Sequence, residues 1–185
     1  MDEEEAEKLL LRETTPDGRL RIFSALLAKE SGLGTEGMTV VGGSAIEIYT
    51  RGDYVSGDVD LVVDSRASVE KVLKRWGFRD EGKGWSKNRW GLFVDVMQSE
   101  FSGWRQLTQI VATSAGSFRI SGVEDLIIRR IRESVAWQDR QEAFAQAVLL
   151  LRRTGSDLDW EYIRLFAKRE GWEDQLAELR RLASR

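Results

Sequence analysis

The sequence predicts an α+β fold, in which a mixed β-sheet carries helices on one face and is followed by a C-terminal helical subdomain. Between about residues 38 and 120, short β-branched or apolar runs alternate with stretches of helical spacing. Beyond Gly122 only the three- and four-residue spacing of helices remains. We therefore expect residues 1–121 to form an α/β core with N-terminal helices, and residues 122–185 to form a helical subdomain packed on that core.

The helices and strands of residues 1–121 follow from helical spacing and from β-branched or apolar runs. Leu20, Phe23 and Leu27 lie on one helical face before Gly32, and β-branched runs mark the strands. We expect helices at about 3–12, 18–31, 44–50 and 68–76, strands at 38–41, 58–63, 78–80, 84–87 and 91–97, and two candidate strands at 107–112 and 117–120. These give a mixed sheet of about four or five strands. Further helices are expected from 123 onward, over 143–153, near 160–167 and over 172–182.

Composition narrows the chemistry that the 185-residue chain can perform. It has no histidine and no cysteine, which excludes a Ser-His-Asp triad, a thiol nucleophile, a zinc finger, a haem and an iron–sulfur cluster. Catalysis would then use carboxylates, Lys or Arg, hydroxyls and bound metal ions. The N-terminus is acidic, without a signal-peptide pattern, and no run approaches the ~20 apolar residues of a membrane span. We expect a cytoplasmic protein that does not associate with membranes.

A diglycine turn follows the first predicted strand, in the segment Val40-Val41-Gly42-Gly43-Ser44-Ala45. Glycines let backbone N–H groups approach phosphate oxygens, and a helix N-terminus favours negative charge. Ser44 is expected to cap that helix and to offer a hydroxyl donor. The segment predicts a phosphate-binding turn, although such a motif by itself is more often only a turn.

Three aspartates on two predicted strands form the second candidate feature. Asp58 and Asp60 are two residues apart and share one face of a strand, while Asp95 stands opposite the apolar residues of a later strand. If the two strands are neighbours, three carboxylates converge on a site that suits Mg²⁺ or Mn²⁺. Asp58 and Asp60 would hold two ions, and Asp95 would hold the first ion and help take a proton from the nucleophile.

Together these residues resemble a known family. Gly42-Gly43-Ser44, a gap of 13 residues, Asp58-Val59-Asp60 and the distant Asp95 resemble the nucleotidyltransferase superfamily of the DNA polymerase β type. The stretch Val41–Val63 is similar to small prokaryotic nucleotidyltransferases of toxin–antitoxin and abortive-infection systems. The resemblance implies a nucleotidyltransferase-like fold with an NTP such as ATP as substrate. It also implies transfer of a nucleoside monophosphate to a protein, an RNA end or a small molecule.

Two arginines extend the resemblance. The family tends to place a basic residue two positions before the serine of its Ser-x-Asp-apolar-Asp pattern, where this chain has Tyr54, so Arg51 would serve instead. A later helix of the family carries a Lys that reaches the phosphates, and Arg130 stands at the similar position. The resemblance thus assigns Arg51 and Arg130 to the nucleotide.

Two alternatives remain open from the sequence. The segment from Arg66 to Arg89 has eight basic and three acidic residues among several tryptophans, and it could receive RNA, DNA or an acidic protein surface. Charge runs are more often solvated faces. The whole fold could also serve as a non-catalytic binding module, an antitoxin-like partner of another protein.

Overall fold

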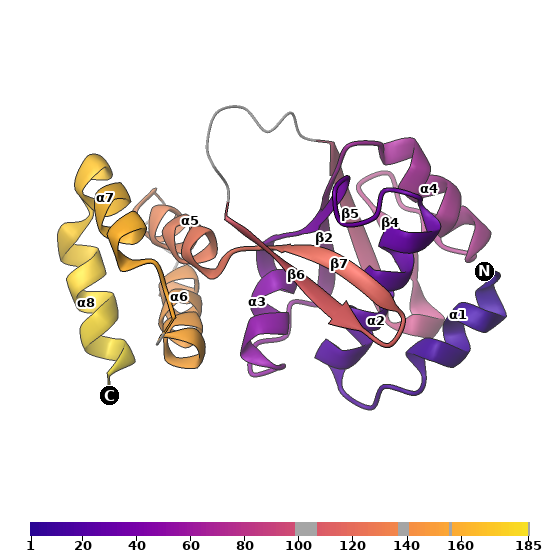
Figure 1. Cartoon of the computed structure of the whole chain (residues 1–185), viewed down its shortest axis with the longest axis horizontal. Coiled ribbons are helices and arrows are strands. Elements are labelled where there is room, and N and C mark those ends of the chain that lie inside the picture. Colours follow the sequence, from indigo (N-terminus) through magenta and orange to yellow (C-terminus); the bar gives the residue numbers. More distant parts are fainter. Residues whose placement is uncertain (99–106, 137–140, 156, 185) are drawn as a thin grey trace. The chain divides into compact units, whose positions relative to one another are not determined.

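The computed structural model describes residues 1–98, 107–136, 141–155 and 157–184. The chain divides into two compact units, Met1–Ser121 and Gly122–Arg185 (Figure 1). The first contains every strand of the described chain and the helices that precede and separate them, and the second is helical.

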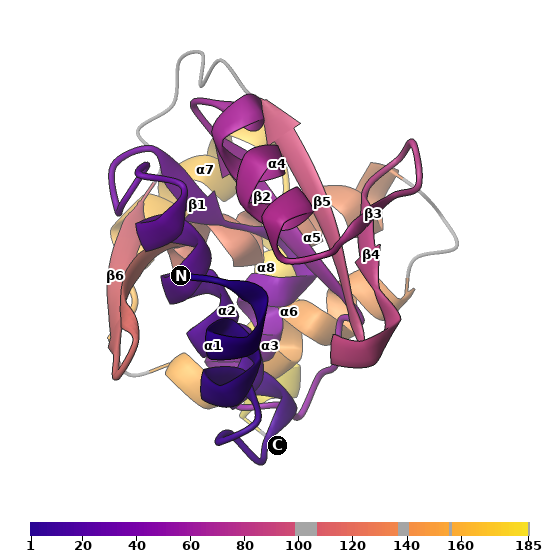
Figure 2. The ribbon, with the colours of Figure 1, turned by 90° about the vertical axis from the view of Figure 1, so that its right-hand side faces the viewer.

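Unit 1 is built on one seven-stranded mixed sheet in the order β3-β4-β5-β2-β1-β7-β6, which Figure 2 shows from β6 at one edge to β3 at the other. The strands are β1 (Met38–Val40), β2 (Asp58–Val63), β3 (Arg79–Asp80), β4 (Trp85–Lys87), β5 (Leu92–Gln98), β6 (Thr108–Thr113) and β7 (Gly116–Ser121). The pairs β2–β5 and β1–β7 are parallel, and the other pairs are antiparallel. The expected four or five strands were too few, because the β6–β7 hairpin, whose two strands were only candidates, joins the sheet.

The helices of unit 1 cover one face of this sheet. They are α1 (Glu3–Leu10), α2 (Pro16–Glu30), α3 (Gly42–Thr50) and α4 (Arg66–Arg75), with a short 3₁₀ turn η1 (Asn88–Trp90) before β5. Helix α2 contacts β7, α3 contacts β2, and α4 contacts β5. Helix α2 also contacts α3 and α4, so these three helices form one layer.

Side-chain alternation decides which residues of the central strands face this layer. Val59 and Leu61 of β2, with Val94 and Val96 of β5, are at most 2% exposed. They form the core with apolar residues of the helices, such as Phe23 of α2, whose ring contacts Trp76. Because successive side chains of a strand point to opposite faces, the aspartates between these residues are turned to the face away from the core.

Unit 2 consists of four helices in its described part: α5 (Val123–Ala136), α6 (Gln141–Thr154), α7 (Trp160–Glu170) and α8 (Glu173–Ala183). Helix α5 packs on α6 and α7, and α8 packs on α6 and α7. Two acids at the start of α5 bind the start of α7, since Glu124 accepts from Asp159 N and Asp125 accepts from the Tyr162 hydroxyl. No helix in the described part of the chain is long and apolar enough to cross a membrane.

Candidate active site

The three predicted aspartates lie on one face of two neighbouring parallel strands. In the register of β2 and β5, Asp60 is directly opposite Asp95, and Asp58 is opposite Phe93. Neighbouring strands are about 4.8 Å apart, so the Asp60 and Asp95 backbones are in direct contact. The expectation that the two aspartate-bearing strands are adjacent is confirmed.

Asp60 is bound to the diglycine turn by two hydrogen bonds. Gly43 N donates to Asp60 Oδ2 at 3.0 Å, and Asp60 N donates to Ser44 Oγ at 3.1 Å. Burial raises the pKa of the Asp60 carboxyl above its usual value, the backbone N–H groups of Gly43 and Ser44 oppose this shift, and the charges of Asp58 and Asp95 add to it. The negative charge of Asp60 is therefore poorly solvated and repelled by its neighbours, and a cation at this face would stabilise it.

Both glycines of the turn are required by close approach. Gly42 has φ +61°, and a Cβ there would lie 2.4 Å from Asp60 Oδ2. A Cβ on Gly43 would lie 2.5 Å from Ser56 Oγ and 3.4 Å from the Tyr54 hydroxyl. The turn is thus enclosed by Asp60 on one side and by the segment before β2 on the other.

Ser44 has a different role from the one expected. Helix α3 begins at Gly42, and its N-cap is Val41, which makes no side-chain cap. The Ser44 side chain is fully buried, donates its proton to Val41 O at 2.8 Å and accepts from Asp60 N. The prediction of Ser44 as N-cap was wrong, and its hydroxyl fixes the backbone of β2 to the turn instead of facing outward.

The structure does not bring Arg51 to the turn. Arg51 is the left-handed C-cap of α3 (φ 54°), at the opposite end of the helix from Gly43 and about 12 Å along its axis at ~1.5 Å per residue. Arg130 lies in unit 2, where its side chain is 13% exposed and forms an ion pair with Glu133 on the same helix. The charge of Arg130 is therefore already balanced.

The arrangement of the acids fits a metal ion only in part. Asp60 lies directly opposite Asp95, and its Oδ2 accepts from the Gly43 N–H. Within the described residues, however, no three acidic side chains are gathered closely enough to hold an ion. The shared face and the mutual repulsion are present, while the close ligand set is not formed in this conformation.

Comparison with known proteins bears on the fold. No protein-family model matches the chain, and no curated protein does either. Among solved structures, the solution structure of the antibiotic-resistance factor ANT(2'')-Ia, an aminoglycoside nucleotidyltransferase, matches with a TM-score of 0.52 and 14% identity. The match covers 98% of this chain and 97% of that chain. The fold is nucleotidyltransferase-like. This confirms the predicted fold class, and the low identity limits the likeness to the fold.

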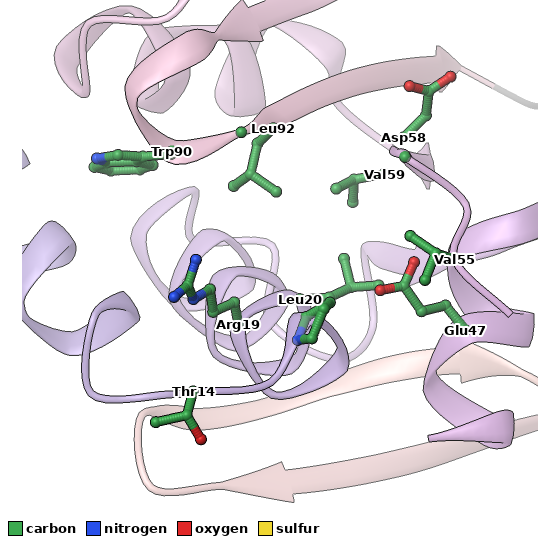
Figure 3. Close-up of a pocket in the computed structure, with 12 residues that line it drawn as sticks. Thr14, Arg19, Leu20, Glu47, Val55, Asp58, Val59, Trp90 and Leu92 are labelled. Atoms are coloured by element: carbon green, nitrogen blue, oxygen red, sulfur yellow. The ribbon is translucent and has the colours of Figure 1, made fainter. Parts of the chain in front are cut away.

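A cavity of about 250 Å³ lies in unit 1 beside the start of β2 (Figure 3). Its walls come from the start of α2, from α3, from the approach to β2, and from the approach to β5. They are Thr14, Pro16, Arg19, Leu20, Glu47, Val55, Gly57, Asp58, Val59, Trp90, Gly91 and Leu92. Figure 3 shows the Glu47 carboxylate directed into the cavity and the Asp58 carboxylate directed away from it. The cavity and the aspartate face are therefore separate surfaces that meet at Asp58.

Sequence reasoning missed three residues that border the turn. Glu47 is 5% exposed, and its Oε2 accepts from Ser56 N at 2.8 Å. Ser56 and Tyr54 in turn lie against Gly43. A signal for Glu47 was present, since an acid between Ile46 and Ile48 of an otherwise apolar helix is unusual and needs a partner.

The basic segment between Arg66 and Arg89 is largely neutralised. Five of its eight basic residues form ion pairs with acids: Arg66, Arg75, Arg79, Lys87 and Arg89. Two of its tryptophans, Trp76 and Trp85, are buried and cannot stack on bases. The structure favours the ion-paired face over a nucleic-acid surface.

Proposed function

We propose that this protein is a metal-dependent nucleotidyltransferase that moves a nucleoside monophosphate from an NTP to a hydroxyl on an acceptor. The observation that carries the proposal is Asp60, whose carboxylate is held by the N–H of Gly43 on the same face as Asp58 and Asp95. This hydrogen bond joins the diglycine turn, at the N-terminus of α3, to the three aspartates. The nucleotidyltransferase-like fold supports the same function.

In this reaction the acceptor oxygen bonds to the α-phosphorus, the bond from that phosphorus to the bridging oxygen breaks, and pyrophosphate leaves. Asp95 takes the hydroxyl proton. The N-terminus of α3 lies beside these acids, and its dipole would favour the charge of the triphosphate. Mg²⁺ or Mn²⁺, held by Asp58, Asp60 and Asp95, would neutralise the triphosphate and stabilise the leaving pyrophosphate.

The acceptor belongs to one of three classes: a protein, an RNA end or a small hydroxylated molecule. Since the structural neighbour is an antibiotic-resistance factor, small molecules are to be tested beside macromolecules. A cognate partner protein remains part of the proposal, as the resemblance to toxin–antitoxin nucleotidyltransferases implies, and so does the cytoplasmic location expected from the sequence.

The test is transfer of label from each of the four α-³²P-labelled NTPs, with Mg²⁺ or Mn²⁺ and cell extract. We expect labelled product with the wild type and at least a hundredfold less with Asp95→Asn, about the lower bound for loss of a general base. Asp60→Asn should also abolish transfer. Asp64→Asn is the matched control, because Asp64 follows the end of β2, about 13 Å along the chain from Asp60 at ~3.3 Å per residue. Equal labelling by wild type and Asp60→Asn would reject the proposal.

One observation favours the second function, a non-catalytic module that binds a partner protein. The three acids are not gathered as a ligand set in the described residues, and Arg130 is neutralised by Glu133. In that case the purified protein would form a stable complex with its partner in EDTA, and Asp60→Asn would leave the complex intact. Loss of the complex in EDTA would argue against it.

A further inference from the structure

We propose that Glu47 is a positioning residue that holds the return loop, residues 51–57, against the diglycine turn and thereby shapes the nucleotide-binding face. The inference rests on the proposed function. It adds a residue that does not touch the reacting atoms but acts through Ser56 and Tyr54.

The return loop has a backbone that needs to be held. Arg51, Gly52 and Gly57 all have left-handed φ values, of 54°, 82° and 82°. Its first half is bonded to the end of α3 by Gly52 N to Glu47 O and by Asp53 N to Thr50 O. In its second half, the Glu47 carboxylate accepts from Ser56 N at 2.8 Å. Glu47 therefore binds both halves of the loop, one by its backbone and one by its side chain.

The held loop is what closes the far side of the turn. With Ser56 N fixed, Ser56 Oγ would lie 2.5 Å from a Cβ placed on Gly43. The Tyr54 hydroxyl would lie 3.4 Å from the same Cβ. The Gly43 N–H itself is bonded to Asp60. The chain of contacts thus runs from Glu47 through the loop to the residue that fixes the Asp60 carboxylate.

A buried glutamate is unfavourable at position 47 of α3 unless its carboxylate holds the return loop. Burial raises the pKa of Glu47, the charge of Asp17 adds to the shift, and the bond from Ser56 opposes it. No ion pair of Glu47 occurs among the described residues. A charged acceptor makes a hydrogen bond roughly twice as strong as a neutral one, which fits the holding of a loop with three left-handed residues.

Without the hydrogen bond from Ser56 N to Glu47, the return loop would become ordered only when the nucleotide binds. The ordering entropy would then oppose binding, and affinity would fall while the Asp58–Asp60–Asp95 face kept its chemistry. We therefore expect KM for the nucleotide to rise more than kcat falls in Glu47→Ala. Glu47→Gln keeps an oxygen that can accept from Ser56 N and should recover most of the affinity.

The experiment compares Glu47→Ala, Glu47→Asp and Glu47→Gln in the full chain, by amide hydrogen exchange and by binding of a non-hydrolysable Mg²⁺–ATP analogue. Glu47→Asp retracts the carboxylate by one methylene and serves if the alanine variant does not fold. The matched control is Glu7→Ala. Glu7 is also a buried acid of unit 1, at 8% exposed, and its carboxylate binds Trp90 Nε1 and Arg89, which are not in the return loop.

We expect exchange at the Ser56 amide to rise at least tenfold in Glu47→Ala and Glu47→Asp, and affinity to fall about tenfold, as loss of one charge-assisted bond predicts. Glu7→Ala should change neither. Wild-type exchange at Ser56 in Glu47→Ala, or an equal loss of affinity in Glu7→Ala, would overturn the inference. A wild-type protein that binds no nucleotide would instead overturn the proposed function.

Discussion

Gly42→Ala tests the contact on which the candidate site is built. The substitution places a Cβ at φ +61° and 2.4 Å from Asp60 Oδ2, with Asp60 Cγ at 2.9 Å. A left-handed backbone costs a non-glycine residue about 1–2 kcal/mol, and overpacking a tight site costs about 1–3 kcal/mol more. The expected loss in the free energy of unfolding is therefore ~2–5 kcal/mol.

Gly57→Ala separates the cost of the left-handed backbone from the cost of the collision with Asp60. Gly57 also has a left-handed φ, of 82°, but a Cβ there would meet no atom within 4 Å. Gly57→Ala should therefore lower the free energy of unfolding only by the cost of the left-handed backbone, about 1–2 kcal/mol. The assay is denaturant unfolding followed by tryptophan fluorescence, since Trp76 and Trp85 are buried in unit 1. Equal losses in the two variants, or a Gly42→Ala loss that is unchanged in an Asp60→Ala background, would refute the collision with Asp60.

Two further predictions concern single side chains. Because burial raises the folded-state pKa of Asp60, its ionised form lowers stability at pH 7. At pH 7, Asp60→Asn should raise the free energy of unfolding. This gain should shrink as pH falls through the folded-state pKa of Asp60 and vanish below the unfolded value of ~3.9. A gain that does not depend on pH in denaturant unfolding would contradict this. Tyr162 donates to Asp125 Oδ1 at 2.6 Å, and burial and this bond raise its pKa. Tyr162→Phe should lose about 1.5–3 kcal/mol of stability and a phenol that titrates at 295 nm above the usual tyrosine pKa, and an unaltered titration curve would refute the assignment.

Local pattern was sufficient to predict the aspartate face. Alternation along β2 and β5 separates Asp60 and Asp95 from Val59 and Val94, and it needs no knowledge of distant contacts. The sequence also indicated where each strand runs. What it could not supply was the count of strands in the sheet, because β7 pairs with β1 across a long stretch of chain.

The role of Ser44 was misjudged because its hydrogen-bond partner is distant in sequence. Ser44 reads as an N-cap, but the β2 backbone, 16 residues away, uses its hydroxyl as an acceptor. Arg51 is near the motif in sequence and at the far end of α3 in space. The pairing of Arg130 with Glu133 is a three-residue helical spacing that the sequence already contained.

The central claim is that Asp58, Asp60 and Asp95, beside the diglycine turn, bind a divalent cation together with a nucleotide. The direct measurement is Mn²⁺ titration by electron paramagnetic resonance, with and without a non-hydrolysable ATP analogue. We expect the analogue to strengthen Mn²⁺ binding to the wild type and to Asp64→Asn, and we expect Asp60→Asn and Asp95→Asn to lose this effect. The same Mn²⁺ binding in wild type and Asp60→Asn would contradict the central claim.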